Sequence, residues 1–129
     1  MILAIKTDQP EAELYLYKDQ KLVAEYSWLA GRELSSSLMI QIEKFLNNND
    51  VEIKNLNAMI VYEGPGSFTG LRIGITVANS IAYSLDIPVS ASGGLNWAQQ
   101  AIDKIDSKKF TVGATPIYGA PVNITKQRK

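Results

Sequence analysis

The sequence predicts an α/β domain with a mixed sheet, in which the first three strands are antiparallel and the later strands are parallel and flanked by helices. Three observations carry this prediction. Apolar residues alternate over residues 11–17, recur at helical spacing over 32–48, and run without interruption over 58–62. Strand-like and helical patterns then alternate, an order typical of layered α/β proteins. Because 129 residues suit a single hydrophobic core, residues 1–129 are expected to form one domain.

Three strands are expected at the start of the chain. Residues 2–5 are a short apolar run, residues 11–17 alternate, and residues 21–28 follow after the short connection Lys18-Asp19-Gln20. The alternation of the second strand puts three apolar residues on one face: Ala12, Leu14 and Leu16. Short connections between consecutive strands predict an antiparallel meander.

A helix is expected from Arg32 to Asn48, because the hydrophobic period changes there from two residues to between three and four. Its apolar face is formed by Leu34, Leu38, Ile42, Phe45 and Leu46. The run Asn47-Asn48-Asn49-Asp50 ends the helix, since Asn and Asp tolerate turn conformations.

The remainder of the chain predicts strand, helix, strand, helix and strand. The expected elements are a buried strand at 58–62, a helix ending near Leu85, a strand at 87–91, a helix at 93–105 and a strand at 110–112. Residues 113–129 contain two glycines and two prolines in their first nine positions, and are expected to be an irregular basic tail rather than a second domain.

Composition excludes several kinds of chemistry. The chain has no Cys and no His, so it lacks thiolate nucleophiles, thiolate metal ligands and the commonest general base. Thirteen basic and thirteen acidic residues cancel, which leaves no net charge to attract nucleic acid. No apolar run approaches the roughly 20 residues of a membrane helix, and the protein is expected to be cytoplasmic and not to bind membranes.

The stretch YEGPGSFTGLRIGI, residues 62–75, follows the predicted buried strand and opens the next helix. Glycines in this position suggest a phosphate-binding loop, but neither common template fits. A Walker loop needs Lys and Ser or Thr after its last glycine, where this chain has Leu71 and Arg72. The dinucleotide template needs a third glycine at the position of Thr69.

The small residues of this stretch instead recur every four positions. We call the set Gly66, Gly70, Gly74, Ala78 and Ala82 the glycine strip. Such a strip lets another backbone approach closely, with Ser67 or Thr69 capping the first helical turn. The other side of this helix is also largely apolar, which predicts a second cover. Two covers are compatible with the sequence: the helix at 32–48 or helices of another chain.

The segment EGPGSFTGLRIGI at 63–75 closely resembles the signature of the TsaB (YeaZ) family, accessory proteins in the synthesis of threonylcarbamoyladenosine beside the anticodon of tRNA. Three further segments resemble the same family: ILAIKT at 2–7, PVSASGGLNWAQQA at 88–101 and PIYGAPVNITK at 116–126. The signature residues carried over are Gly64, Pro65, Gly66, Ser67, Phe68, Thr69, Gly70, Leu71, Arg72 and Gly74.

The resemblance implies one lobe of an actin-like, Hsp70-like ATPase (ribonuclease H-like) fold. It also implies a scaffold without catalytic, cofactor-binding or metal-binding residues of its own, which pairs with a TsaD-like catalytic subunit and is joined by a TsaE-like ATPase. ATP would be used by the partner complex, and tRNA would be contacted only through it. The implied pairing surface lies on the first two helices: Leu34, Leu38, Ile42, Phe45, Gly70, Ile73, Gly74, Val77, Ala78 and Ile81.

The sequence departs from the family pattern in two ways. Lys6 stands where the family commonly has an acidic residue at the end of the first strand, and a carboxylate there would order a metal ion near phosphates. The second lobe that the family usually carries is absent between the last helix and the terminal segment, so the chain looks like a one-lobe form.

Alternatives to the scaffold are a self-contained nucleotide-binding lobe and a peptidase-like enzyme using Ser67 and Lys6. A homodimer through the same helices is compatible with the scaffold.

The charge of the tail generates a prediction about RNA. After Asp106 the chain has five basic residues and no acidic one: Lys108, Lys109, Lys126, Arg128 and Lys129. Replacing Lys126, Arg128 and Lys129 by Gln is expected to weaken tRNA binding by the full complex and to flatten its salt dependence, because each phosphate contact releases counterions. Filter binding over a salt series measures both quantities, and equal affinities for the two proteins at every salt concentration would exclude the tail from RNA binding.

Overall fold

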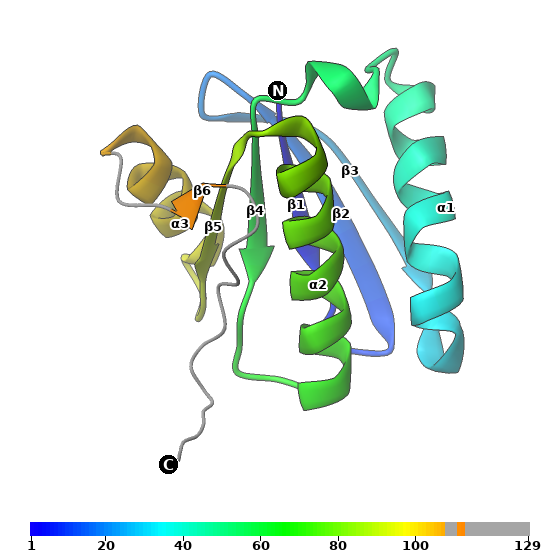
Figure 1. The fold of residues 1–129 in the computed structure, drawn as a ribbon. Helices are drawn as coiled ribbons and strands as arrows, with labels where there is room; N and C mark the ends of the chain where they lie inside the picture. Colours follow the sequence, from blue (N-terminus) through cyan, green and yellow to red (C-terminus); the bar gives the residue numbers. More distant parts are fainter. Residues whose placement is uncertain (108–110, 113–129) are drawn as a thin grey trace.

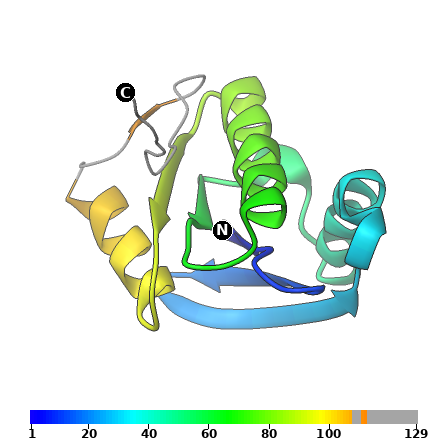
Figure 2. The same cartoon turned by 90° about the horizontal axis from the view of Figure 1, so that it is seen from below.

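The computed structural model describes residues 1–107 and 111–112, which form a six-stranded sheet with helices on both faces (Figure 1). The strands are β1 (Ile2–Lys6), β2 (Glu11–Lys18), β3 (Lys21–Leu29), β4 (Ala58–Tyr62), β5 (Pro88–Ser92) and β6 (Thr111–Val112). The α-helices are α1 (Leu34–Asn48), α2 (Phe68–Leu85) and α3 (Trp97–Asp106). The strand order is β3-β2-β1-β4-β5-β6. Helices α1 and α2 cover one face of the sheet and α3 covers the other (Figure 2).

The predicted antiparallel meander is confirmed. Strand β2 pairs with both β1 and β3 in antiparallel register, and its Ala12, Leu14 and Leu16 are fully buried on one face. The connection from β2 to β3 is a two-residue turn in which Asp19 and Gln20 have φ angles of 51° and 67°. Positive φ at both positions is the type I′ geometry, which matches the twist of the paired strands.

Strands β4 and β5 are parallel to β1, as the continuous apolar run at 58–62 predicts, whereas the expected last strand is antiparallel. Strand β4 pairs with β1 in the register Ile2↔Ala58 and with β5 in the register Met59↔Val89. All five residues of β4 are buried, because helices lie against both faces of the sheet at this strand. Strand β6 pairs antiparallel with β5 at the far edge. Phe110, the first residue of the predicted last strand, and the tail 113–129 lie outside the described residues.

Two helix boundaries differ from the sequence prediction. The expected helix from Arg32 begins with a short 3-10 turn (Gly31–Glu33), and α1 proper starts at Leu34. The expected helix at 93–105 starts only at Trp97. Gly94 has a φ of +80°, outside the helical region, and the Gly93 backbone packs against the Gly64 carbonyl. These glycines therefore form a loop contact, which helical periodicity does not reveal.

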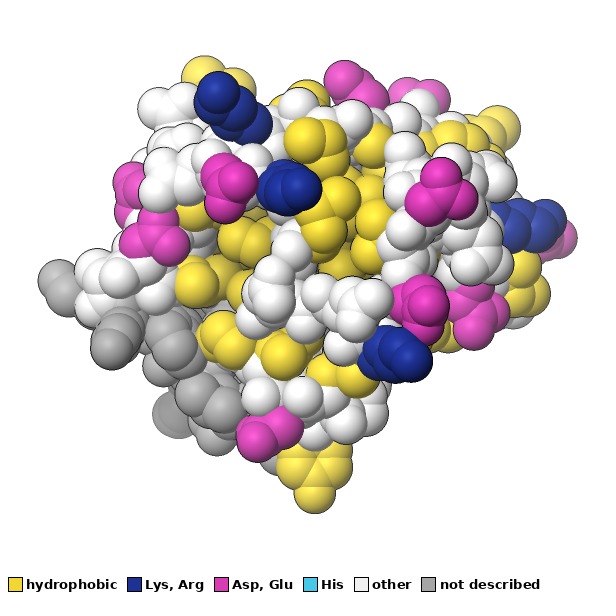
Figure 3. All heavy atoms as spheres, turned by 90° about the horizontal axis from the view of Figure 1, so that it is seen from above, with side chains coloured by type: hydrophobic (Ala, Val, Ile, Leu, Met, Phe, Trp, Pro, Cys, Tyr) yellow, Lys and Arg dark blue, Asp and Glu magenta, His cyan; other side chains and the backbone are white. Residues whose placement is uncertain are grey.

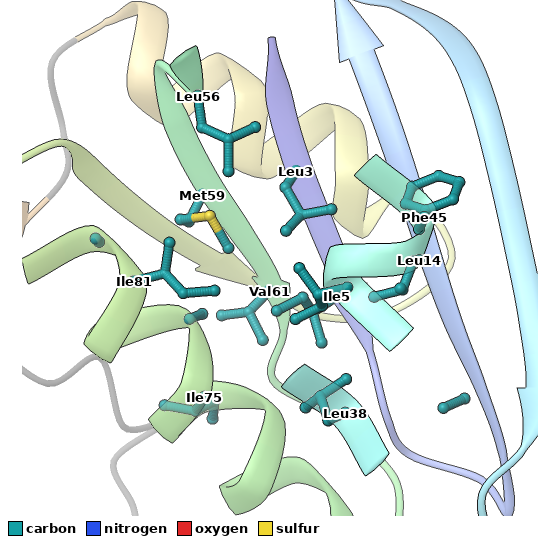
Figure 4. Packing of buried hydrophobic residues seen from close by; sticks show 14 of the residues in the cluster. Leu3, Ile5, Leu14, Leu38, Phe45, Leu56, Met59, Val61, Ile75 and Ile81 are labelled. Carbon is teal, nitrogen blue, oxygen red and sulfur yellow. The ribbon is translucent and has the colours of Figure 1, made fainter. Parts of the chain in front are cut away.

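The hydrophobic core has one layer on each face of the sheet. The larger layer, shown in Figure 4, joins Leu3 and Ile5 of β1 to Leu38 of α1 and Ile75 of α2. The smaller layer joins Ala4 and Ile60 of the central strands to residues of α3, among them Trp97, Ala101 and Ile102. Each layer depends on alternate residues of the same strands, so a strand shifted by one residue would exchange its two faces.

The connections at the end where β1 begins close the larger core layer. Val51 and Ile53, which precede β4, and Ile87, which precedes β5, are partly buried against it. Figure 3 shows apolar side chains gathered in the middle of this end and charged side chains mostly around them. Among the described helices none is both long and apolar enough to cross a membrane.

The packing of α1 predicts different effects for two neighbouring residues. Leu38 is fully buried, whereas Met39 is 37% exposed. Leu38→Ala is expected to lower the free energy of unfolding by about 3 kcal/mol, because it removes buried methyl groups and leaves a cavity. Met39→Ala is the matched control, with an expected loss below about 1 kcal/mol. Urea unfolding followed by circular dichroism measures both, and equal losses would mean that α1 is not docked through Leu38.

Candidate partner interface

The loop between β4 and α2 is held between the ends of β1 and β5, the two strands that flank β4. The Ser67 N–H donates to the Asp8 carbonyl at 3.1 Å, just beyond β1. The Glu63 N–H donates to the Ser92 carbonyl at 2.9 Å, and the Gly94 N–H donates to the Gly64 carbonyl at 3.1 Å, both at the end of β5. These backbone hydrogen bonds place the family-like signature at the edge of the sheet where the parallel strands end.

Ser67 is the N-cap of α2, one of the two caps that the sequence allowed. Its hydroxyl oxygen accepts a long hydrogen bond of 3.4 Å from the Gly70 N–H. The Tyr62 hydroxyl donates to the Pro65 carbonyl at 2.7 Å and so links the loop to its own strand. The polar groups of this loop thus satisfy the backbone at the start of the helix.

The glycine strip faces the sheet of its own chain, which is the internal packing that the sequence left open beside contact with a partner. A Cβ atom at Gly70 would overlap the Thr7 carbonyl oxygen, and one at Gly74 would overlap the Thr7 hydroxyl. The Thr7 hydroxyl donates to the Gly70 carbonyl at 2.7 Å. Ala78 and Ala82 are fully buried further along the same face of α2. The close approach that the strip permits is therefore the contact between α2 and the end of β1.

Most of the other predicted interface residues are also buried within the chain. Five side chains, from 0 to 6% exposed, belong to the larger core layer: Leu34, Leu38, Ile42, Phe45 and Ile81. In the free chain the sheet and the neighbouring helix cover them, and their contact with a partner stays a prediction. Helix α1 is therefore the second cover of α2, which the sequence could not distinguish from a helix of another chain.

Besides Gly70, the predicted interface residues that stay partly exposed are Ile73 and Val77. They lie four positions apart on α2, and so share one side of that helix. Three exposed apolar side chains on α1 and α2 were missed by sequence reasoning: Met39 at 37%, Ile40 at 52% and Tyr83 at 65%. Met39 and Ile40 stand beside the core positions of α1 but outside its three-to-four-residue period, which is the signal that could have identified them. We call Met39, Ile40, Ile73, Val77 and Tyr83 the outer helix face.

A hollow of about 330 Å³ lies where the first turn of α2 meets the start of α1. It brings together three of the predicted interface residues, Leu34, Gly70 and Ile73. Arg32 and Thr69 also line it. The exposed signature residues Phe68 and Arg72 lie in the first two turns of α2, where the Arg72 guanidinium is 5.4 Å from the centre of the Phe68 ring. This end of the helix pair thus combines apolar walls with exposed polar side chains.

Lys6, the last residue of β1, is engaged by Asp8 just beyond the strand and by Tyr62 of β4. Its ammonium lies 2.7 Å from the Asp8 carboxylate and 4.6 Å from the centre of the Tyr62 ring. The ammonium is thus engaged by Asp8, and the Ser67 hydroxyl oxygen accepts the capping hydrogen bond of α2, so the two side chains have other partners than one another. Over residues 1–107 and 111–112, the acidic side chains form no group of three suited to a metal ion.

Comparison with known proteins first identifies the structural class of the fold. The family model described as "TsaD: tRNA N6-adenosine threonylcarbamoyltransferase" matches residues 28–101. In solved structures the fold is similar to "YeaZ from Pseudomonas aeruginosa", with a TM-score of 0.67 and 26% identity over 81% of this chain and 49% of that one. The fold is thus an actin-like lobe of the type found in TsaD and YeaZ.

Sequence relatives narrow the class. The chain is 38% identical over 94 residues to "tRNA threonylcarbamoyladenosine biosynthesis protein TsaB" of Bacillus subtilis, covering 73% of this chain and 41% of the relative. It is 32% identical to the protein of the same name in Escherichia coli, over 68% of this chain and 38% of the relative. The chain belongs to the TsaB (YeaZ) family. It spans about half the length of the relatives that it matches.

The inward direction of the glycine strip predicts the effect of a single methyl group. Gly74→Ala is expected to lower the free energy of unfolding by about 2 kcal/mol, because the overlap with Thr7 outweighs the gain of about 1 kcal/mol in helix propensity. Thr7→Ala removes the overlapping hydroxyl, so Gly74→Ala should cost much less in a Thr7→Ala background. Ser80→Ala, at an exposed position of α2, is the control.

Urea unfolding of the four combinations at residues 7 and 74 measures this coupling. Additive effects of the two substitutions, or a Gly74→Ala variant as stable as the parent, would contradict the contact between α2 and the end of β1.

Proposed function

We propose that this chain is a non-catalytic scaffold that pairs with a TsaD-like catalytic subunit in the threonylcarbamoyladenosine modification of tRNA. The observation that carries the proposal is the outer helix face, which leaves apolar side chains exposed on the two helices beside the family signature. Aromatic and aliphatic side chains that pack into a partner's pockets supply most of the binding energy in protein interfaces. The family relationship supplies the identity of the partner.

The hydrogen bonds of the polar residues in and beside the signature also support a scaffold. Ser67 caps α2, Thr7 binds the Gly70 carbonyl, and Lys6 is paired with Asp8. These polar groups stabilise the start of α2 and the end of β1, and an enzyme would need some of them free to meet a substrate. The chemistry therefore belongs to the partner complex, which would use ATP and include a TsaE-like ATPase. Contact with tRNA would occur only within that complex.

A homodimer through the outer helix face is the second candidate, since the same apolar side chains suit a second copy of the chain. It is compatible with the scaffold, because the free protein could exchange one partner for the other. A self-contained nucleotide-binding lobe or peptidase-like enzyme has less support, given the engagement of Lys6 and Ser67.

Size-exclusion chromatography with light scattering tests the proposal, with this chain alone and mixed with the TsaD-like subunit of the same organism. A heteromer is expected. Ile40→Glu should weaken it by at least about 30-fold, because a carboxylate would be buried in the apolar contact. The side chain of Ile40 is 52% exposed in the free chain, so the variant should keep its fold and its melting temperature.

Leu22→Glu is the matched control, because Leu22 is 46% exposed and lies on β3 rather than on the helices. Separate peaks for the two unmodified proteins would reject the scaffold. A heteromer weakened equally by both variants would place the contact elsewhere than the outer helix face.

A further inference from the structure

Strand β3 presents an unpaired edge. It is the outermost strand of the sheet and pairs only with β2 among the described residues. The register shifts between Leu16 and Tyr17 of β2, opposite the start of β3, and is regular from there to the pair Glu11↔Leu29. Residues 24–29 are therefore a straight stretch, in which every second residue directs its N–H and C=O away from the sheet.

The side chains of this edge are unusually accessible for a strand of nine residues. Seven of the nine residues are exposed and the other two, Ala24 and Trp28, are partly buried; Leu29 is 80% exposed. No Pro interrupts the stretch, and Leu29, Tyr26 and Val23 are apolar. An exposed edge of this kind is a template for adding a further strand.

One face of the edge is acidic. Directly opposite residues of paired strands share a face, so the pairs Tyr15↔Glu25, Glu13↔Ser27 and Glu11↔Leu29 bring three carboxylates to the side of the sheet that bears α3. We call Glu11, Glu13 and Glu25 the acidic face. A hollow of about 490 Å³ is lined by all three, with Tyr15, Tyr26 and Ser27. Neither ion pair found in the described part of the chain, Lys6–Asp8 or Lys54–Glu52, involves them.

The pKa values of the two tyrosines beside these carboxylates, Tyr15 and Tyr17, are both raised. Burial is the main reason that the pKa of Tyr15 is raised, and its hydrogen bond to Glu13 and the charges of Glu13 and Glu25 raise it further. The pKa of Tyr17 is raised by burial and then by Glu25. A negative potential over β2 and β3 favours a positively charged neighbour.

The other face of the edge is aromatic. Tyr26 is 40% exposed and stacks on Trp28, with ring centres 5.8 Å apart, and on Phe45 of α1, at 6.2 Å. Tyr26 lies opposite the buried Leu14, so this stack is on the side of the sheet that bears α1 and α2. A strand added to β3 would thus have carboxylates along one face and an aromatic ring along the other.

Charge decides between two occupants of the edge. A second copy paired through its own β3 in antiparallel register would continue the acidic face, placing like charges side by side. An extended segment with Lys or Arg at every second position would set these side chains beside Glu25 and Ser27 of β3, on the face that also carries Glu11 and Glu13 of β2. Its alternate residues would then lie beside Tyr26, where apolar side chains fit best.

We propose that residues 24–29 of β3 are a docking edge for an extended polypeptide segment of alternating basic and apolar residues, which adds to the sheet as a seventh strand. Backbone hydrogen bonds supply affinity and the acidic face supplies selectivity. This surface lies at the edge of the sheet, apart from the outer helix face, so its occupation does not depend on pairing with a catalytic subunit.

The probe is an acetylated and amidated peptide of about seven residues alternating Lys and Val, titrated into the ¹⁵N-labelled 129-residue chain. The expected result is a shift of the amide resonances of residues 24–29 and slower hydrogen exchange at alternate amides. Glu25→Lys should weaken binding about fivefold, because an attraction becomes a repulsion. Glu43→Lys makes the same charge change at an exposed position of α1 and is the matched control.

Two further peptides separate strand addition from charge attraction. A peptide with Glu in place of Lys should not bind, and a peptide N-methylated at alternate residues should bind without slowing exchange at β3. Three results would overturn the proposal. They are equal exchange protection of β3 by the methylated peptide, amide shifts confined to α1 and α2, and equal losses of peptide affinity for Glu25→Lys and Glu43→Lys. Without peptide, exchange protection of the outward-facing β3 amides, those not bonded to β2, would also overturn the proposal. It would assign the edge to a second copy if the protection rises with concentration, or to residues 113–129 if their deletion removes it.

Discussion

The contact between α2 and the end of β1 is the constraint on which the arrangement of the molecule depends. Without Cβ atoms at Gly70 and Gly74, the helix comes close enough for its backbone to meet Thr7, whose hydroxyl bonds the Gly70 carbonyl. The start of α2 then reaches Asp8, and the loop before α2 reaches the end of β5. Two glycines inside a helix cost about 2 kcal/mol in helix propensity. That cost is offset by a helix seated directly on the central strands.

Local periodicity was enough to predict the layers, the antiparallel meander and the buried parallel strand at 58–62. It was not enough to predict what covers each face. The four-residue recurrence of Gly70, Gly74 and Ala78 showed that these positions share a side of α2, but a recurrence cannot say whether that side meets its own sheet or another molecule. The start of α3 was misplaced for a related reason, because Gly93 and Gly94 are fixed by a tertiary contact with Gly64. The exposure of Met39 and Ile40 likewise depends on how α1 is rotated over β3.

The family signature acquires a structural meaning from these contacts. Its glycines, Ser67 and Leu71 secure the first turns of α2, whereas Phe68 and Arg72 remain at the surface. A protein of this kind would perform its function through the shape and accessibility of its surfaces rather than through reactive side chains. The outer helix face lies on α1 and α2 and the β3 edge on the outermost strand, so the two proposed contacts use separate parts of one small chain.

The pairing of β1 with β4 joins residues that are far apart in the chain, as the register Ile2↔Ala58 shows. During synthesis, β1, β2 and β3 leave the ribosome well before β4 does. The edge of β1 that will pair with β4 is unpaired during this time. Folding of the central sheet is therefore limited by a non-local encounter, which is slow compared with the closing of a hairpin. Until β4 pairs with β1, the nascent chain exposes the apolar residues Leu3 and Ile5. A chaperone that binds exposed apolar segments would act mainly before this pairing.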